Sequence, residues 1–128
     1  MRFVDFTRIK AWQKGHDYVL AVYEAVKGFP EFEKYGLLNQ FTRAAVSITA
    51  NISEGVQKVS KADKHRFLNI SQGSLGECRN YNIIAFDLHY IDSEEFNKLN
   101  QMLSEASFFL NKYYEGIEND NGIKDNLI

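Results

Sequence analysis

The side chains of this sequence that are able to do chemistry are few, and their spacing does not assemble a catalytic set. Di-iron centres in helical bundles use Glu-x-x-His pairs. No glutamate of this chain meets that spacing; Glu54 is followed three residues later by Gln57, and Glu77 by Asn80. Glu54 and Glu77 could face each other as paired carboxylates, but no neighbouring residue completes a catalytic set. We therefore expect no catalytic residue and no enzyme.

The other reactive side chains fit structural roles. His16 falls on an apolar helical stripe, where a lone histidine is usually a hydrogen-bonded core residue. Cys78 also falls on such a stripe and is expected to be a small core residue. As the only cysteine, it excludes an internal disulfide and a multi-cysteine metal site. The GSLG segment at 73–76 lies inside a predicted helix rather than after a strand, so it is no phosphate loop. We predict neither a metal site nor a cofactor site.

Four amphipathic helices are predicted to position these residues. Apolar side chains recur at steps of three and four within residues 7–28, 37–52, 60–88 and 92–117. We expect N-caps at Thr7, Ser60 and Asp92, and an end to the first helix at Gly28 with Pro30. The predicted core stripes are Ile9, Trp12, His16, Val19, Tyr23 and Val26; Leu37, Phe41, Ala44, Ala45, Ile48 and Ile52; Phe67, Ile70, Ser74, Cys78, Tyr81, Ala85 and Leu88; and Phe96, Leu99, Leu103, Ala106, Leu110, Tyr113 and Ile117.

Four such helices with short connections bury their stripes most simply as an all-α antiparallel up-down-up-down bundle. A chain of 128 residues is long enough for one domain. We expect that domain at 1–118 and a loosely ordered tail at 119–128. Small residues predict that the second and third helices form the tightest pair; they are Ala44, Ala45, Ser47, Ser71, Gly73, Ser74 and Gly76.

Composition limits the class of protein further. Hydrophobic residues make up 45% of the chain and charged residues 25%, as in ordinary globular proteins. No apolar run approaches the length of a membrane span, and the first ten residues, MRFVDFTRIK, lack the apolar core of a secretory signal. We therefore expect a cytoplasmic protein without a membrane partner. The net charge of -2 argues against a generally cationic nucleic-acid binder but leaves room for a local basic patch.

A polar stripe runs beside the apolar stripe of the second helix. Its residues recur at steps of three and four, and a carboxylate of the third helix could join them; the set is Gln40, Arg43, Ser47, Asn51, Glu54 and Glu77. One interpretation is a solvated flank with local pairs. The other is a partly buried network at a helix or subunit boundary, where polar groups need partners. We predict that Arg43 and Glu54 are at least partly buried, within one chain or across a subunit boundary.

Several segments in this order resemble one known family. They are AWQKG at 11–15, FPEFEKYGLLNQ at 29–40, RAAVSITANISEG at 43–55 and FLNISQGSLGE at 67–77. Together they resemble the four helix bundle protein family, also called the 23S rRNA-intervening sequence protein family, over roughly residues 6–117. The resemblance implies a small bundle that assembles into a ring-shaped homopentamer, with a poorly defined biochemical role. A related branch, the accessory variability proteins of diversity-generating retroelements, binds nucleic acid and a reverse transcriptase.

Apolar residues outside the four stripes also bear on assembly. They are Leu68, Leu75 and Phe86; Met102, Phe108 and Phe109; and Val46 and Ala50. They either widen the intramolecular face of each helix or form an exposed patch, which often marks an interface. With the resemblance, they favour a homo-oligomer, and we expect a non-enzymatic assembly or adaptor protein with a protein partner.

The alternative is a nucleic-acid-associated accessory factor. In an up-down-up-down bundle, the chain start and the loop between the second and third helices lie at the same end. Both carry an excess of cations; the candidate contacts for RNA or DNA are Arg8, Lys10, Lys14, Lys58, Lys61, Lys64 and Arg66. Acidic residues near the C-terminus return to this end and would screen it. An extended basic surface would favour this alternative over the adaptor.

Overall fold

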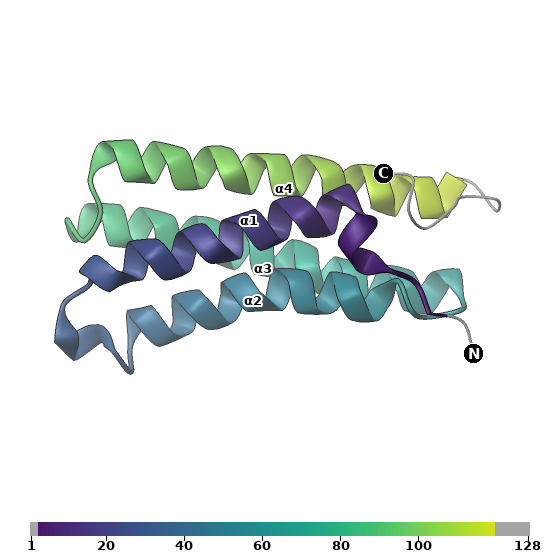
Figure 1. Ribbon diagram of the computed structural model, residues 1–128, viewed down its shortest axis with the longest axis horizontal. Coiled ribbons are helices and arrows are strands. Elements are labelled where there is room, and N and C mark those ends of the chain that lie inside the picture. The colour runs from purple at the N-terminus through teal and green to yellow at the C-terminus, as the bar shows by residue number, and fades with distance from the viewer. Residues whose placement is uncertain (1–2, 120–128) are drawn as a thin grey trace.

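The computed structural model describes residues 3–119, and all regular structure in that range is helical. The long helices are α1 (Lys10–Ala25), α2 (Leu37–Gly55), α3 (Lys61–Asp87) and α4 (Ser93–Asn119). Successive helices run in opposite directions (Figure 1), which confirms the predicted all-α up-down-up-down bundle. Asn119 closes α4, and the rest of the expected tail at 119–128 lies outside the described residues.

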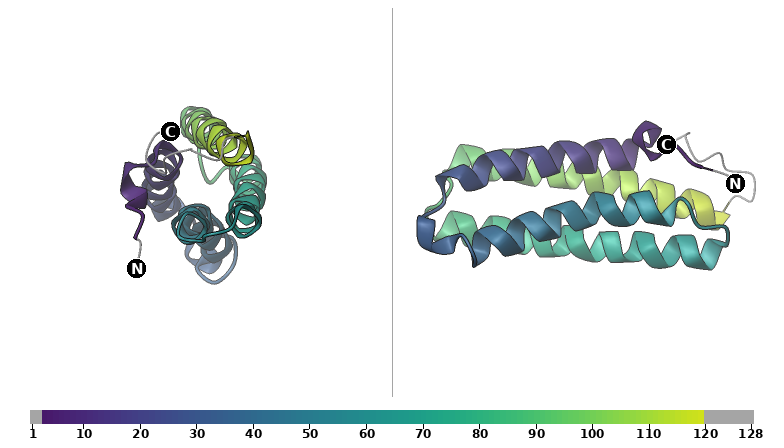
Figure 2. Two further views of the ribbon diagram at one scale, coloured as in Figure 1. Left: turned by 90° about the vertical axis from the view of Figure 1, so that its right-hand side faces the viewer. Right: turned by 60° about the horizontal axis from the view of Figure 1, so that its bottom comes forward.

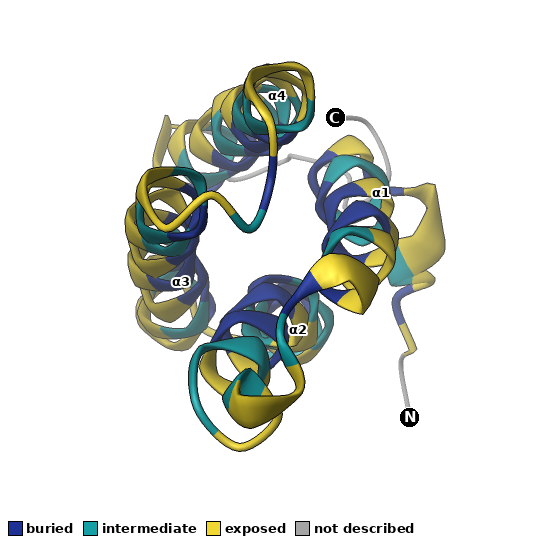
Figure 3. Cartoon of the chain, turned by 90° about the vertical axis from the view of Figure 1, so that its left-hand side faces the viewer, coloured by how far each residue is buried: buried dark blue, intermediate teal, exposed yellow. Residues whose placement is uncertain are grey.

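The four helices occupy the corners of a bundle around one apolar core (Figure 2). Helix α1 packs against α2 and α4, and α3 packs against the same two helices from the other side. Therefore α1 and α3 stand at opposite corners, and buried residues line the inner side of each helix (Figure 3). Within the described range, no helix carries an apolar run long enough to cross a bilayer.

Two of the three predicted N-caps are confirmed. The Ser60 hydroxyl accepts a hydrogen bond from the Asp63 N–H at 3.1 Å, and the Asp92 carboxylate accepts one from the Glu95 N–H at 2.8 Å. These bonds satisfy backbone donors in the first turns of α3 and α4. The prediction for Thr7 is wrong, because Asp5 caps a separate 3-10 turn at Phe6–Arg8 before α1 begins.

The predicted core stripes of α2 and α4 are confirmed, since all their members are buried except the half-buried Leu37 and Phe96. The stripe predicted for α1 is wrong at Tyr23, which is exposed, and its members Trp12 and His16 are only half-buried. The stripe of α3 is wrong at Ile70 and Leu88, which are also exposed. The core of α3 instead includes two leucines that the stripe left out, Leu68 and Leu75. A bundle helix faces two neighbours, so the buried side of α3 is wider than the predicted stripe.

Helices α2 and α3 make the most extensive contact of the bundle, as predicted. The Ser71 hydroxyl donates to the Ile48 carbonyl oxygen at 2.7 Å, and the Ser74 hydroxyl donates to the Ser47 hydroxyl at 2.8 Å. Gly73 and Gly76 do not share this contact. Both are exposed, and a Cβ atom added to either would meet nothing within 4 Å. The prediction that they belong to the surface facing α2 is wrong.

Candidate functional site

An open groove of about 540 Å³ follows the contact between α2 and α3. It is lined by Asn39, Gln40, Arg43, Ala44, Ser47, Glu77 and Tyr81. Four of the six residues of the predicted polar network lie in this lining, and α2 and α3 bring them together from distant parts of the sequence. The other two, Asn51 and Glu54, continue the same stripe along α2 beyond the groove.

Hydrogen bonds join members of this stripe to one another and to α3. The Asn51 amide donates to the Ser47 carbonyl oxygen at 2.8 Å and to the Ser47 hydroxyl at 3.0 Å. The Tyr81 hydroxyl donates to the Gln40 amide oxygen at 3.4 Å. Burial, and then the nearby Glu77 carboxylate, raises the pKa of Tyr81. Tyr81 is therefore a neutral hydrogen-bonding group at physiological pH.

The two charged residues that we singled out in this stripe are exposed in the single chain. Arg43 points away from the core, and Glu54 makes a 3.8 Å ion pair with Lys58 one turn later in sequence. The single chain therefore does not bury either residue. Their burial across a subunit boundary stays a prediction. The groove offers a guanidinium, a carboxylate, amides and hydroxyls, which suit hydrogen bonding to a partner.

A buried polar chain in the core was missed by the sequence analysis. The Tyr18 hydroxyl donates to the Asn82 amide oxygen at 2.9 Å, and the Asn82 amide donates to the Asn100 amide oxygen at 3.0 Å. These two bonds join α1, α3 and α4. The available signal was Asn82 itself, which lies four residues after Cys78 on the core side of α3.

The buried Tyr18 hydroxyl and the neighbouring Cys78 thiol are chemically unreactive. Burial is the main cause that raises the pKa of Tyr18, and burial also raises the pKa of the Cys78 thiol to about 12. Neither group forms an anion near neutral pH, so neither is a ready nucleophile. As predicted, Cys78 is a fully buried core residue.

The start of the chain and the loop between α2 and α3 meet at one end of the bundle, as predicted (Figure 1). The Gln57 amide joins them, because its oxygen accepts from the Val4 N–H at 3.0 Å and its nitrogen donates to the Val4 carbonyl oxygen at 2.8 Å. The last turn of α4 returns to this end. Four of the seven candidate nucleic-acid contacts are exposed: Arg8, Lys10, Lys61 and Arg66.

Two of the seven candidate contacts, Lys58 and Arg66, lie against the Phe67 ring. The Lys58 ammonium lies 5.0 Å from the centre of the Phe67 ring, and the Arg66 guanidinium lies 4.6 Å from it. Cation–π attraction of this kind is worth about 0.5–1 kcal/mol at exposed sites. The ring holds both cations at the basic end, and the Lys58 ammonium is also shared with Glu54.

Lys64 has a structural role. It is buried, and its ammonium donates to the Val56 carbonyl oxygen at 3.0 Å, directly after the end of α2. A cation at a helix C-terminus interacts favourably with the exposed carbonyl groups there. Lys64 therefore anchors the α2–α3 connection and is the least accessible of the seven candidates.

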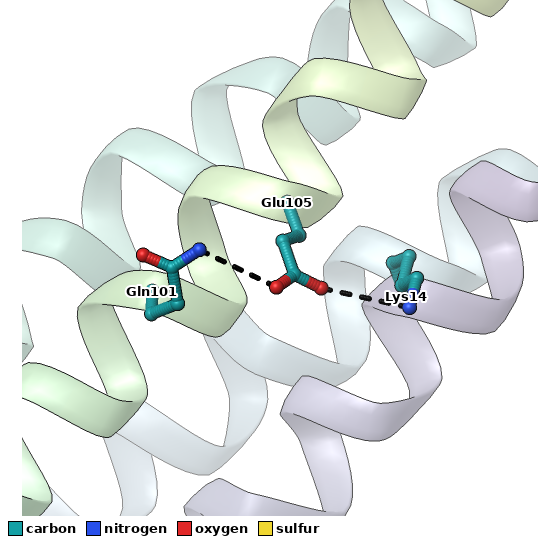
Figure 4. Close-up of polar contacts among 3 residues, drawn as sticks. All are labelled: Lys14, Gln101 and Glu105. Atoms are coloured by element: carbon teal, nitrogen blue, oxygen red, sulfur yellow. Dashed lines mark hydrogen bonds and ion pairs between the residues drawn. The ribbon is translucent and has the colours of Figure 1, made fainter.

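Lys14 lies apart from this cluster, on the side of α1 that faces α4 (Figure 4). Its ammonium is 3.5 Å from the Glu105 carboxylate, which also accepts a 3.4 Å hydrogen bond from the Gln101 amide. The pair is partly exposed, and such pairs contribute little to stability. Lys14 is thus engaged between helices, and the structure does not bring it together with the candidates at the start of α3.

No three side chains of the metal-binding kinds converge anywhere in residues 3–119. His16 is half-buried on α1, and its ring stacks on Trp12 at 4.6 Å between centres. This is a packing contact between half-buried rings, not a core position.

Comparisons with known proteins agree on one relationship. A family model described as 23S rRNA-intervening sequence protein matches residues 7–112. A crystal structure of a protein of unknown function from Bacteroides thetaiotaomicron, described as an S23 ribosomal protein family member, superposes with a TM-score of 0.75 at 24% identity. The match covers 82% of this chain and 98% of that one, and it shows a shared fold. No curated protein matches the chain.

Proposed function

Because the chain belongs to the 23S rRNA-intervening sequence protein family, we propose that it is a non-enzymatic homo-oligomeric assembly or adaptor protein. A ring of five subunits is the arrangement that we expect from the family resemblance. The protein acts by presenting repeated surfaces to a protein partner. The cytoplasm is the proposed location, since a lone cysteine fits a reducing compartment.

One observation carries this proposal: α3 buries several polar side chains in the core while two of its isoleucines stay exposed. Ser71, Ser74 and Asn82 are buried, whereas Ile70 and Ile83 are each 45% exposed. Fully burying an isoleucine side chain contributes about 1.5–3 kcal/mol relative to leaving it exposed. A second packing surface outside the bundle would gain part of that energy, and an assembly of several chains provides such a surface.

Exposed apolar residues on other helices support the same proposal. Leu20 and Tyr23 of α1 and Val46 of α2 are exposed, and Val46 was expected outside the core. Of the other apolar residues that lie outside the predicted stripes, Leu68 and Leu75 belong to the core, so they do not contribute to an interface.

Native mass spectrometry at micromolar subunit concentration tests the assembly. We expect one closed oligomer, with five subunits as the leading stoichiometry. A clean monomer under these conditions would refute the proposed function. A closed oligomer with another subunit number would retain the assembly and correct the expected stoichiometry.

A second candidate function is binding of RNA or DNA at the basic end, and the meeting of exposed cations there favours it. Arg8, Lys61 and Arg66 suit the test because all three are exposed. Replacing all three with alanine is expected to weaken binding of single-stranded RNA in low-salt anisotropy titrations, and binding should fall steeply with salt. Deleting residues 119–128 is expected to strengthen it. No binding by either the full chain or the deletion variant at low salt would remove nucleic acid from the partners.

The matched control replaces three lysines toward the opposite end. Lys27, Lys34 and Lys98 are also exposed, and their replacement with alanine changes the net charge by the same amount. Equal losses in both triple variants would show a general charge effect rather than a site at the basic end.

A further inference from the structure

Two different faces at opposite corners of the bundle are exposed or half-buried, although Phe6 packs on Trp12 at the start of the first of them. The α1 face is a stripe of large side chains at steps of four, four and three; its members are Trp12, His16, Leu20 and Tyr23. The α3 face is a stripe at steps of three, four and three; its members are Gly73, Gly76, Asn80 and Ile83. Figure 3 shows α1 and α3 at opposite corners of the bundle. Neither stripe includes a charged residue.

We infer that the α1 face of one copy packs against the α3 face of a second copy. This inference rests on the proposed homo-oligomer and names its interface. Because the two faces are different, the contact is heterologous, and repeating it builds a ring or an open chain rather than an isolated two-fold dimer. Large side chains on one face and glycines on the other are complementary in shape, since a glycine lets a neighbouring group approach the backbone.

Gly73 and Gly76 are suited to this role because no contact within the chain requires a glycine at either position. A glycine inside an exposed helix costs about 1 kcal/mol relative to alanine. Gly15 and Gly55 of the same chain are buried, with close neighbours where a Cβ atom would lie. Gly73 and Gly76 have no such neighbour. A second copy seated on α3 supplies one.

The two faces lie at the same level along the bundle. Gly15 approaches Ile48 from α1, while Ser71 bonds to the Ile48 carbonyl oxygen from α3. Further along, Tyr18 of α1 reaches Asn82 of α3. A rotation axis parallel to the bundle moves no subunit along its length, so residues at equal levels meet in such a ring. The α1 face therefore meets the α3 face without a shift.

Charge complementarity agrees with this docking. Asp17 borders the α1 face, and Arg79 borders the α3 face. Both are exposed, and no ion pair formed within residues 3–119 includes either of them. Lys14 and Gln72 bond to α4 residues. Asp17 follows Lys14 by one turn and Arg79 follows Gln72 by two turns, so both border residues lie on the side of their helix toward α4. When the α1 corner of one copy meets the α3 corner of another, Asp17 and Arg79 therefore lie on the same side of the contact.

The first experiment breaks each face separately and measures native mass at micromolar concentration. Leu20→Glu and Gly76→Arg are each expected to convert the oligomer to monomers with unchanged helical circular dichroism, because both positions are exposed. Phe108→Glu on α4 is the matched control, since Phe108 is 56% exposed and Leu20 is 57% exposed. The control is expected to keep the oligomer. An oligomer that survives both face variants, or is lost in the control, overturns the inference and leaves the proposed homo-oligomer intact.

The second experiment mixes the two broken variants. In a heterologous contact, the intact α3 face of Leu20→Glu still fits the intact α1 face of Gly76→Arg. The mixture is therefore expected to form a heterodimer and nothing larger. A mixture that stays monomeric would contradict the pairing of these two faces.

The third experiment exchanges the charges at the border. Asp17→Arg and Arg79→Asp are each expected to raise the subunit dissociation constant by about tenfold or more, and the double variant to recover most of that loss. Because α1 and α3 occupy opposite corners of one chain, recovery requires contact between copies. Absence of recovery overturns the proposed pairing of Asp17 with Arg79, and a monomeric parent protein overturns the homo-oligomer itself.

Discussion

Replacing Tyr18 with phenylalanine tests whether the buried polar chain stabilises the bundle. The ring is fully buried, and phenylalanine keeps it, so only the hydroxyl is lost. That hydroxyl donates to the Asn82 amide oxygen at 2.9 Å. Its removal leaves a buried acceptor without this donor, which costs about 1–3 kcal/mol. We therefore expect Tyr18→Phe to lower the free energy of unfolding by an amount in that range.

Urea denaturation followed by far-ultraviolet circular dichroism measures this loss. The subunit concentration must be fixed, because the stability of an oligomer depends on it. Tyr35→Phe is the matched control, since Tyr35 is 85% exposed and lies outside the two faces assigned to the contact between copies. Its effect should stay within about 0.5 kcal/mol, as for ordinary surface substitutions. Equal effects of the two substitutions would refute the stabilising role of the Tyr18–Asn82 bond.

Three further outcomes follow from single contacts. Lys64→Met keeps the apolar stem but loses the bond to the Val56 carbonyl oxygen, and we expect urea unfolding to show a loss of about 1.5–3 kcal/mol; an unchanged midpoint would contradict the anchoring role. Asp92→Ala removes the acceptor of the Glu95 N–H and should lower the free energy of unfolding by about 0.5–2 kcal/mol in the same assay. An unchanged free energy would contradict a stabilising cap. Burial raises the pKa of Cys78 from 9.0 to about 12, so the folded state keeps a proton that the unfolded state loses. The free energy of unfolding should therefore fall as pH rises from about 9 to about 12. Cys78→Ala should flatten this fall when unfolding is measured across that window, and an unchanged slope would assign it to other groups.

Much of the fold could be predicted because α2 and α4 are strongly amphipathic, and their apolar periodicity marks the core side directly. The caps at Ser60 and Asp92 were also local signals. Helix α3 was harder, because its core side includes serines and an asparagine while isoleucines face outward. Its predicted stripe included the exposed Ile70 and Leu88 and missed the buried Leu68 and Leu75. Contacts with two neighbours are a tertiary property that periodicity alone does not report.

The candidate sites divide in the same way. The grouping of Gln40, Arg43, Ser47 and Glu77 could be predicted, because the first three share one side of α2 and the antiparallel contact brings Glu77 beside them. The burial of Lys64 could not, since a lysine among other charged residues at the start of a helix is expected to be solvated. Its ammonium turns inward only because the last carbonyl groups of α2 need donors. Tyr18 was missed because its partner, Asn82, lies on another helix.

The glycine-bearing centre of α3 has a consequence for local motion. Gly73 and Gly76 lie within one turn of each other, at a point where the outer side of the helix has no covering side chain. Glycine favours unfolded conformations, so in a free subunit this turn should open more readily than the corresponding turn of α4. Its backbone amides should exchange their hydrogens for deuterium faster, because local opening sets the exchange rate. A neighbouring copy over α3 would slow that exchange, so the rate of deuterium uptake at this single turn reports assembly from inside the helix.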